Sequence, residues 1–245
     1  MSWEFVVLGI FVGIAFTSES ITGFGSIVIA VALGSLLFPI PQLLPILVPL
    51  SVFMSSALFI RFFRDIDFRL LFKRMLPFML AGMLLGIALL QVLSSDALKA
   101  AFAVLVLWFA LREWYKLQRG IITRPKPVWW QPWWTFCAGI THGLFASGGP
   151  LLVYSMNTFA IAKANFRATL VCVWLGLNLT YSAIMWQQGL IQPVLPVILA
   201  YLPVLAIAFW LGHRIHKRVN ERQFKQIVYA LLTFSAGAML LSTIP

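Results

Sequence analysis

The sequence predicts an all-α integral membrane protein of two inverted repeats, each a glycine-broken helical hairpin plus three transmembrane helices. Three observations lead to this fold class. Of the 245 residues, 61% are hydrophobic and only 10% are charged, whereas soluble domains carry about 25% charged residues. The apolar residues form long runs without charge. Two of these runs are broken by glycine clusters at similar places in the two halves of the chain.

Six apolar segments have the length of a helix that crosses a bilayer. They cover residues 43–60, 75–93, 97–112, 168–187, 193–212 and 225–243. Two longer stretches, 4–38 and 133–161, exceed one comfortable crossing. The first is interrupted at residues 20–26 and the second at residues 147–150. Each stretch is therefore either one broken crossing helix or a hairpin of two shorter helices.

The distribution of basic residues favours the hairpins. If both stretches turn back, every Lys and Arg except Lys99 lies on one face of the membrane. If each stretch crosses once, the basic residues divide almost evenly, which is contrary to the positive-inside rule. The hairpin interpretation predicts cytoplasmic basic loops and places the N- and C-termini outside. It leaves open whether the hairpins stop at mid-depth or nearly cross.

The two halves are related by a nearly constant offset. An offset of 126 residues pairs Gly86 with Gly212, and an offset of 124 pairs Gly25 with Gly149. A half with one hairpin and three crossings has its ends on opposite faces, so the second half runs inverted. Inverted repeats are an architecture of secondary transporters. The expected units are a first membrane repeat at 1–115, a cytoplasmic linker at 116–132 and a second membrane repeat at 133–245.

The two glycine breaks form the expected binding site. Unwound backbone at membrane depth is tolerated only inside protein or beside a wet cavity. Helix N-termini after the breaks would direct N–H groups and partial positive charge at an anion. Glycine also permits close helix packing in membranes, but two paired clusters favour binding. The expected substrate-binding residues are Thr22, Gly23, Phe24, Gly25, Ser26, Ser147, Gly148 and Gly149.

Glu19 and His142 are the candidates for carrying a coupled proton. Glu19 lies in an apolar region beside the first break, and His142 occupies nearly the corresponding place before the second. A carboxylate inside a membrane is costly and marks a functional site, and histidine exchanges a proton near neutral pH. A contact between the two side chains would serve this role. In the alternative interpretation Glu19 faces the outer vestibule and His142 is a satisfied core donor.

Other function classes receive little support. The net charge of +11 comes from loops between apolar segments, so it does not indicate nucleic acid. Cys137 and Cys172 are expected to be reduced core residues without metal-ligand spacing. His213 and His216 are expected in a solvated basic loop. The sequence contains no catalytic constellation and no phosphate-binding loop, so we expect no enzyme activity, no cofactor and no metal.

The glycine motifs resemble those of a known family. Residues 23–25 (Gly-Phe-Gly) are similar to a signature of the sulfite exporter TauE/SafE family, also called the toluene sulfonate uptake permease family. The matching second-half signature is represented by Gly139, Gly143 and residues 147–150. The resemblance implies a bacterial or archaeal inner-membrane permease for small sulfur-containing or carboxylate anions. Ser26 and Ser147 stand where glycine is common in the family, which leaves the substrate open.

We therefore expect a secondary transporter of small organic or sulfur oxyanions, such as sulfite or sulfonates, that works by alternating access. Its partners would be the anion, the lipid bilayer and, as the coupling ion, protons. Two alternatives remain at this point. One is a passive anion channel, and the other is a membrane accessory subunit that transports nothing.

Overall fold

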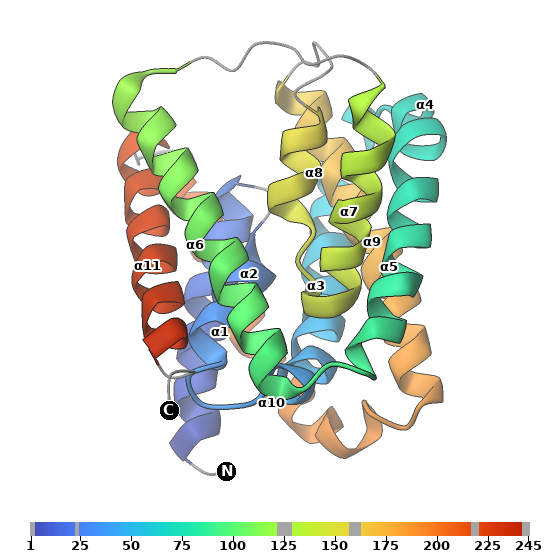
Figure 1. Cartoon of the computed structure of the whole chain (residues 1–245). Helices are drawn as coiled ribbons and strands as arrows, with labels where there is room; N and C mark the ends of the chain where they lie inside the picture. Colours follow the sequence, from blue (N-terminus) through green and yellow to red (C-terminus); the bar gives the residue numbers. More distant parts are fainter. Residues whose placement is uncertain (1–2, 23–24, 122–128, 157–162, 217–220, 242–245) are drawn as a thin grey trace.

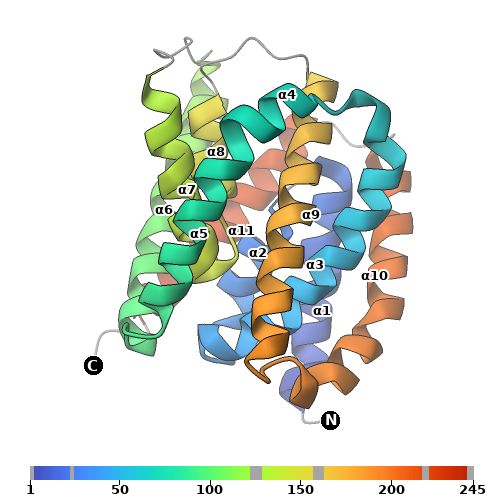
Figure 2. The same ribbon diagram turned by 90° about the vertical axis from the view of Figure 1, so that its right-hand side faces the viewer.

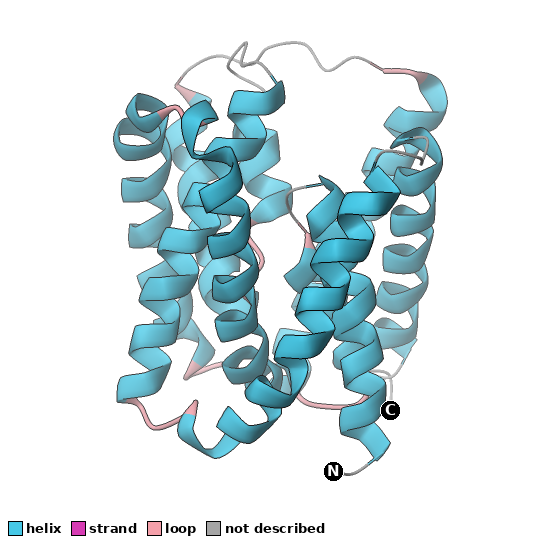
Figure 3. Cartoon of the chain, turned by 180° about the vertical axis from the view of Figure 1, so that it is seen from behind, coloured by secondary structure: helices cyan, strands magenta, loops and turns pink. Residues whose placement is uncertain are grey.

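The computed structural model describes residues 3–22, 25–121, 129–156, 163–216 and 221–241. In this part of the chain nearly all residues are helical and no strand occurs (Figure 3). The α-helices are α1 (Trp3–Thr22), α2 (Ser26–Gly34), α3 (Ile40–Phe62), α4 (Phe68–Leu70), α5 (Leu76–Leu90), α6 (Ser95–Arg119), α7 (Trp130–Phe145), α8 (Gly149–Met156), α9 (Lys163–Gln187), α10 (Leu195–His216) and α11 (Glu221–Leu241). Shorter turns are η1 (Phe63–Asp65), η2 (Leu71–Met75) and η3 (Gln192–Val194). The all-α expectation is confirmed.

Long apolar helices account for most of the structure. Those with the length and composition to cross a membrane are Trp3–Ile21, Ile40–Asp65, Phe68–Leu90, Asn165–Gln187 and Gln192–Ile215. The last four coincide with expected crossings, and α6 and α11 occupy the other two expected places. The 25 residues of α9 extend about 37 Å at 1.5 Å per residue, which exceeds a hydrocarbon core of about 30 Å.

Two helix pairs turn back inside the bundle. The 20-residue α1 is followed after a short break by the 9-residue α2, and the 16-residue α7 by the 8-residue α8. The members of each pair pack against one another. In Figure 1, α1 starts at the lower end of the bundle, as α11 ends there, whereas α7 starts at the upper end. The two pairs therefore enter the bundle from opposite ends.

Helix packing follows one pattern in the two halves. The most extensive contacts between helices pair α5 with α7, α1 with α10, α3 with α9, and α6 with α11. Figure 2 shows α3 beside α9 and α5 beside α7. Numbering the long helices of each half in order matches α1 with α7, α3 with α9, α5 with α10, and α6 with α11. If each helix is replaced by its match in the other half, the same four packed pairs result. The α5–α7 pair becomes the α10–α1 pair, and the α3–α9 and α6–α11 pairs are unchanged.

Glycine allows the closest of these helix contacts. A Cβ on Gly82 of α5 would overlap the carbonyl oxygen of Phe136 in α7, and a Cβ on Gly143 would overlap that of Met83 in α5. Gly86 and Gly139 lie in the same contact. Small residues spaced four apart let helix backbones approach within a membrane. The tight α5–α7 contact therefore fixes the position of α7, and with it the second helix break.

The short helix α2 lies at the centre of the molecule. All nine of its residues are buried, which is possible because the segment Ser26–Gly34 contains a single polar side chain, that of Ser26. Besides α1, it contacts α3, α6 and α11. The N-terminus of α2 is therefore held inside the bundle, within reach of groups from several helices.

Candidate functional site

A small buried cavity lies where the two helix breaks approach each other. It is lined by Glu19, Gly25, Ser26, Ile27, Val28, Ser51, Ala146, Ser147, Gly148, Gly149, Trp174 and Asn178. Five of the expected substrate-binding residues thus line one cavity, together with Glu19. Thr22 ends α1, and Gly23 and Phe24 lie outside the described residues.

The cavity has a free volume of about 30 Å³. Measured in this way, one water molecule needs on the order of 10–15 Å³. The space suits very small polar ligands or one or two waters in this conformation. A larger anion requires the walls to separate, and the walls come from different halves of the chain.

The first break presents a helix N-terminus to the cavity. Gly25 adopts a left-handed conformation with φ 95°, and no side chain caps α2 there. The first hydrogen bond of the helix runs from the Ile29 amide to the Gly25 carbonyl oxygen at 3.2 Å. The amides before Ile29 have no partner within the helix, as at every helix start. Three of the residues that carry them, Ser26, Ile27 and Val28, line the cavity.

A side-chain contact spans this break. The hydroxyl group of Ser26 donates a hydrogen bond to the Glu19 carboxylate. Both side chains are buried, each with 2% of its residue surface exposed. Glu19 therefore lines the inner cavity, and the alternative that it faces an outer vestibule is not what the structure shows.

The second break has a different local geometry. Ala146 is in the left-handed region with φ 50°, the one described residue other than glycine with a positive φ. The Ser147 hydroxyl is buried without a hydrogen-bond partner. Gly148 packs so closely on the backbone of Ala138 that a Cβ would overlap its carbonyl oxygen. The first helical bond of α8 joins the Leu152 amide to the Gly148 carbonyl oxygen at 3.0 Å.

Helices α3 and α9 supply site residues that are not in the set expected from the sequence. Trp174 and Asn178 lie four residues apart on one face of α9 and line the cavity. The Asn178 amide donates to the Ser51 hydroxyl of α3 at 3.0 Å. The sequence signal was a polar side chain one turn after a tryptophan within an apolar crossing, but helical spacing alone does not show which face meets the cavity.

Three of the residues that line the cavity have a buried polar atom without a hydrogen bond: Ser147 Oγ, Trp174 Nε1 and Asn178 Oδ1. Folded proteins pair the large majority of such atoms, so unpaired ones need an explanation. The Ser147 hydroxyl can donate and the Trp174 indole N–H can only donate. Two donors of this kind, beside a helix N-terminus, match the hydrogen-bonding needs of an oxyanion.

His142 does not contact Glu19, contrary to the expected pairing. Its ring stacks on that of Trp174, with centroids 5.7 Å apart and planes 18° apart, and lies 6.4 Å from the ring of Tyr181. The imidazole lies next to Asn178, but neither ring nitrogen makes a hydrogen bond of normal geometry. The His142 side chain therefore packs against α9, where its ring contacts those of Trp174 and Tyr181. It is buried without being a satisfied core donor.

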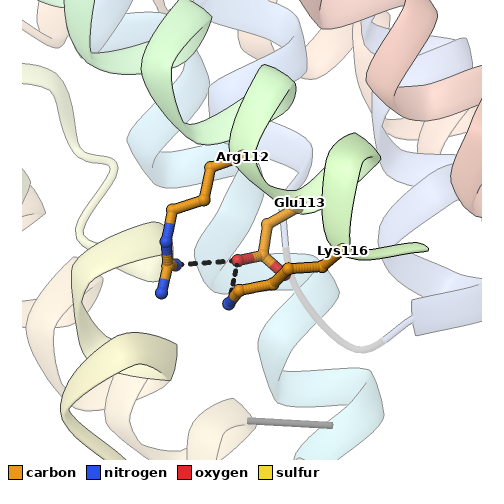
Figure 4. A network of polar contacts seen from close by, with 3 residues as sticks. All are labelled: Arg112, Glu113 and Lys116. Carbon is orange, nitrogen blue, oxygen red and sulfur yellow. Dashed lines mark hydrogen bonds and ion pairs between the residues drawn. The ribbon is translucent and has the colours of Figure 1, made fainter. Parts of the chain in front are cut away.

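One cluster of charged groups lies on α6, outside the cavity. On α6, Arg112 and Lys116 each approach Glu113 at 2.8 Å (Figure 4). The Arg112 guanidinium also lies 4.7 Å from the ring centroid of Tyr154 in α8, so the cluster links α6 to the second hairpin. Within the described part of the chain no three His, Cys, Asp or Glu residues are placed to hold a metal ion.

Two histidines expected in a loop are helical instead. Both His213 and His216 belong to α10, and the His213 side chain lines a second cavity. The helix continues past its last apolar residues, which is why the charge pattern misplaced its end. Cys137 and Cys172 are free, as expected.

The fold and the site define a multi-pass membrane protein with two interrupted helices around a small cavity whose lining includes Glu19, Ser26, Ser147 and Asn178. Residues 5–239 match the family model of the sulfite exporter TauE/SafE, so the chain belongs to this family. Membership supports a membrane transporter in general, and it is consistent with a protein that is not an enzyme. Searches of curated proteins and of solved structures gave no match.

Proposed function

We propose that this protein is a secondary transporter of small sulfur-containing or organic oxyanions, such as sulfite or sulfonates, working by alternating access. The observation that carries the proposal is the shared cavity, which is lined by the first residues of α2 and by Ser147 and Trp174, two residues with buried, unpaired donors. Family membership narrows the anions to be tested first, beginning with sulfite.

Uncharged donors suit a carrier that must release its substrate. No Lys or Arg is among the described residues that line the cavity. An anion would be held by amide, hydroxyl and indole N–H groups together with the positive end of the α2 dipole. Such donors hydrogen-bond to the oxyanion without forming a buried ion pair. Release of the anion therefore does not leave an unpaired, buried positive charge in the protein.

Glu19 supplies a reason for coupling to protons. Its carboxyl group lines the same cavity as the proposed anion site. A charged carboxylate in the cavity wall would repel a bound anion, whereas a protonated carboxyl group would not. Binding of an anion and binding of a proton to Glu19 would therefore favour each other by linkage. Because His142 contacts neither Glu19 nor the cavity, we assign the proton to Glu19 and withdraw His142 as its partner.

Alternating access would arise from two inverted repeats. Support comes from the hairpins that enter from opposite ends (Figure 1) and from helix pairs that map onto themselves when the halves are exchanged. In such an architecture the two halves can exchange conformations, which opens the central site first to one side and then to the other. The basic end with Arg61, Arg64 and Arg69 would be cytoplasmic by the positive-inside rule, in a bacterial or archaeal inner membrane with both termini outside.

The proposal is tested by purifying the full chain and reconstituting it into liposomes. A carrier gives saturable uptake of sulfite, and sulfite loaded inside accelerates uptake of labelled sulfite from outside. A passive channel instead gives conductance in planar bilayers that rises with salt and shows no such exchange. Absence of both flux and conductance for sulfite, thiosulfate and small sulfonates would overturn the proposal and favour an accessory subunit.

A further inference from the structure

A second cavity opens between the ends of four helices. Its volume is about 180 Å³, larger than that of the central cavity. It is lined by Ser20, Leu58, Arg61, Phe62, Arg167, Phe209 and His213. These residues come from the last turns of α1, α3 and α10 and from the first turns of α9. Three of them carry basic side chains.

The two arginines of this cavity lack acidic partners. Unlike Arg112 in the α6 cluster of Figure 4, neither Arg61 nor Arg167 forms an ion pair with a described carboxylate. Their guanidinium carbons lie 5.9 Å and 4.7 Å from the centroid of the same ring, Phe62. Two cations beside one ring repel each other, and an anion bound near both would offset that repulsion.

Arg167 also has a structural role. Its Nη2 donates to the Ser20 carbonyl oxygen at 3.1 Å, which satisfies a carbonyl in the last turn of α1 as basic side chains commonly do. Its Nε is buried and has no hydrogen-bond partner. No hydrogen bond or ion pair joins Arg61 to another described residue, so capping does not account for Arg61.

The last turn of α1 separates this cavity from the central one. Ser20 lines the outer cavity and its neighbour Glu19 lines the central cavity. The Ser20 hydroxyl donates to the Phe209 carbonyl oxygen at 3.1 Å, which holds the α1 turn against α10. The last turn of α1 would therefore separate an anion in the outer cavity from the proposed transport site.

The opposite end of the molecule has no equivalent charge. The offset of 126 residues pairs Arg61 with Gln187, and it pairs His213 with Ile87. The corresponding partner of Arg167 is Pro41. The shared fold of the halves thus does not require these basic side chains. The positive-inside rule accounts for basic residues at this end, but it does not explain why Arg61 and Arg167 line the same cavity.

We propose that the outer cavity, defined by Arg61, Arg167 and His213, is a vestibule site that binds a small oxyanion before it passes to the central cavity. The proposal rests on the proposed transport function. Arginines without acidic partners around a hollow raise the local concentration of anions and their rate of capture. Such capture depends on salt. At an ionic strength of 0.1 M, dissolved ions screen most of the attraction between exposed charges that are more than about 10 Å apart.

The test compares Arg61→Gln with the control Arg64→Gln in liposomes of phosphatidylcholine alone. Arg64 is exposed at the same end but does not line the cavity. Initial rates of sulfite uptake are measured over a range of sulfite concentrations at low and high KCl. Arg61→Gln should raise the half-saturating concentration about threefold to tenfold at low salt, with an unchanged maximal rate. Arg61→Lys should restore the wild-type value.

High salt should remove the difference between wild type and Arg61→Gln, which loss of a purely structural contact would not do. Equal behaviour of Arg61→Gln and Arg64→Gln would overturn the vestibule while saturable wild-type uptake upholds transport. If the effect of Arg61→Gln occurs only when anionic lipid is added, the cavity holds a lipid headgroup and the vestibule is again overturned. Absence of wild-type sulfite uptake would overturn the transport function, and the vestibule with it.

Discussion

The Ser26 hydroxyl donates a hydrogen bond to the Glu19 carboxylate across the first helix break. This contact joins the last turn of α1 to the first turn of α2 while both side chains remain buried. It also places a titratable group in the wall of the cavity that receives the second break. One carboxyl group therefore borders both the helix break and the proposed substrate site.

Replacement of Glu19 by Gln should uncouple transport from the proton gradient. The amide keeps the size of the side chain and can still accept a hydrogen bond from Ser26, but it cannot exchange a proton. In liposomes with an alkaline interior and fixed external pH, the gradient should accelerate sulfite uptake by wild type and leave Glu19→Gln unaffected. Glu4→Gln, which changes the other acid of α1, is the control. Equal stimulation of Glu19→Gln would assign the proton elsewhere.

Gly25→Ala should reduce transport more than it reduces stability. The left-handed conformation of Gly25 costs other residues about 1–2 kcal/mol, and relief of this strain would turn the α2 amides away from the cavity. Gly189→Ala is a matched control, because Gly189 has φ 75° in a turn remote from the cavity and also has open space around it. Both variants should lose similar thermal stability. Only Gly25→Ala should lose most sulfite uptake, and normal uptake by it would exclude the first break from the site.

Trp174→Phe should weaken substrate binding with little change in the fold. Phenylalanine keeps an aromatic ring against His142 but removes the unpaired indole N–H. A hydrogen bond to a charged group contributes about 1.5–3 kcal/mol, so KM for sulfite should rise about tenfold or more. Trp186→Phe, on the same helix but half exposed, should leave KM unchanged. An unchanged KM in Trp174→Phe would remove this donor from the proposed site.

Gly82→Ala should destabilise the whole bundle. The added Cβ meets the Phe136 backbone of α7, and overpacking of this kind typically costs about 1–3 kcal/mol. Gly237→Ala is the matched control on α11, where nothing lies within 4 Å of an added Cβ. Thermal unfolding of the purified protein should show a lower midpoint for Gly82→Ala and no decrease for Gly237→Ala. Equal midpoints would show that close α5–α7 packing does not determine stability.

The sequence was most informative where backbone and composition decide the structure. Long charge-free runs predicted the helices, and the glycine breaks predicted the two places where helices end inside the bundle. Gly25 and Gly149 were found because a break needs residues that tolerate unusual backbone geometry and close approach. These local requirements can be seen in a single chain segment.

Features that depend on approach between distant helices could not be predicted. Ser51 and Trp174 join the cavity because α3 packs on α9 and brings them to the breaks. The expected contact between Glu19 and His142 was wrong because aromatic rings of α9 hold the imidazole. Similar positions in two halves do not specify which way a side chain turns. His213 was misplaced because a basic, polar helix end resembles a loop in composition.

The central claim is that both broken helices turn back, from opposite ends, so that their breaks share one cavity. Labelling of introduced cysteines with an impermeant maleimide tests it most directly, in a chain with Cys137 and Cys172 replaced by Ala. We predict that Arg64→Cys and Arg214→Cys react only after cells are opened, whereas Gln188→Cys reacts in intact cells. Reaction of Arg64→Cys and Arg214→Cys from opposite sides of the membrane would contradict the claim.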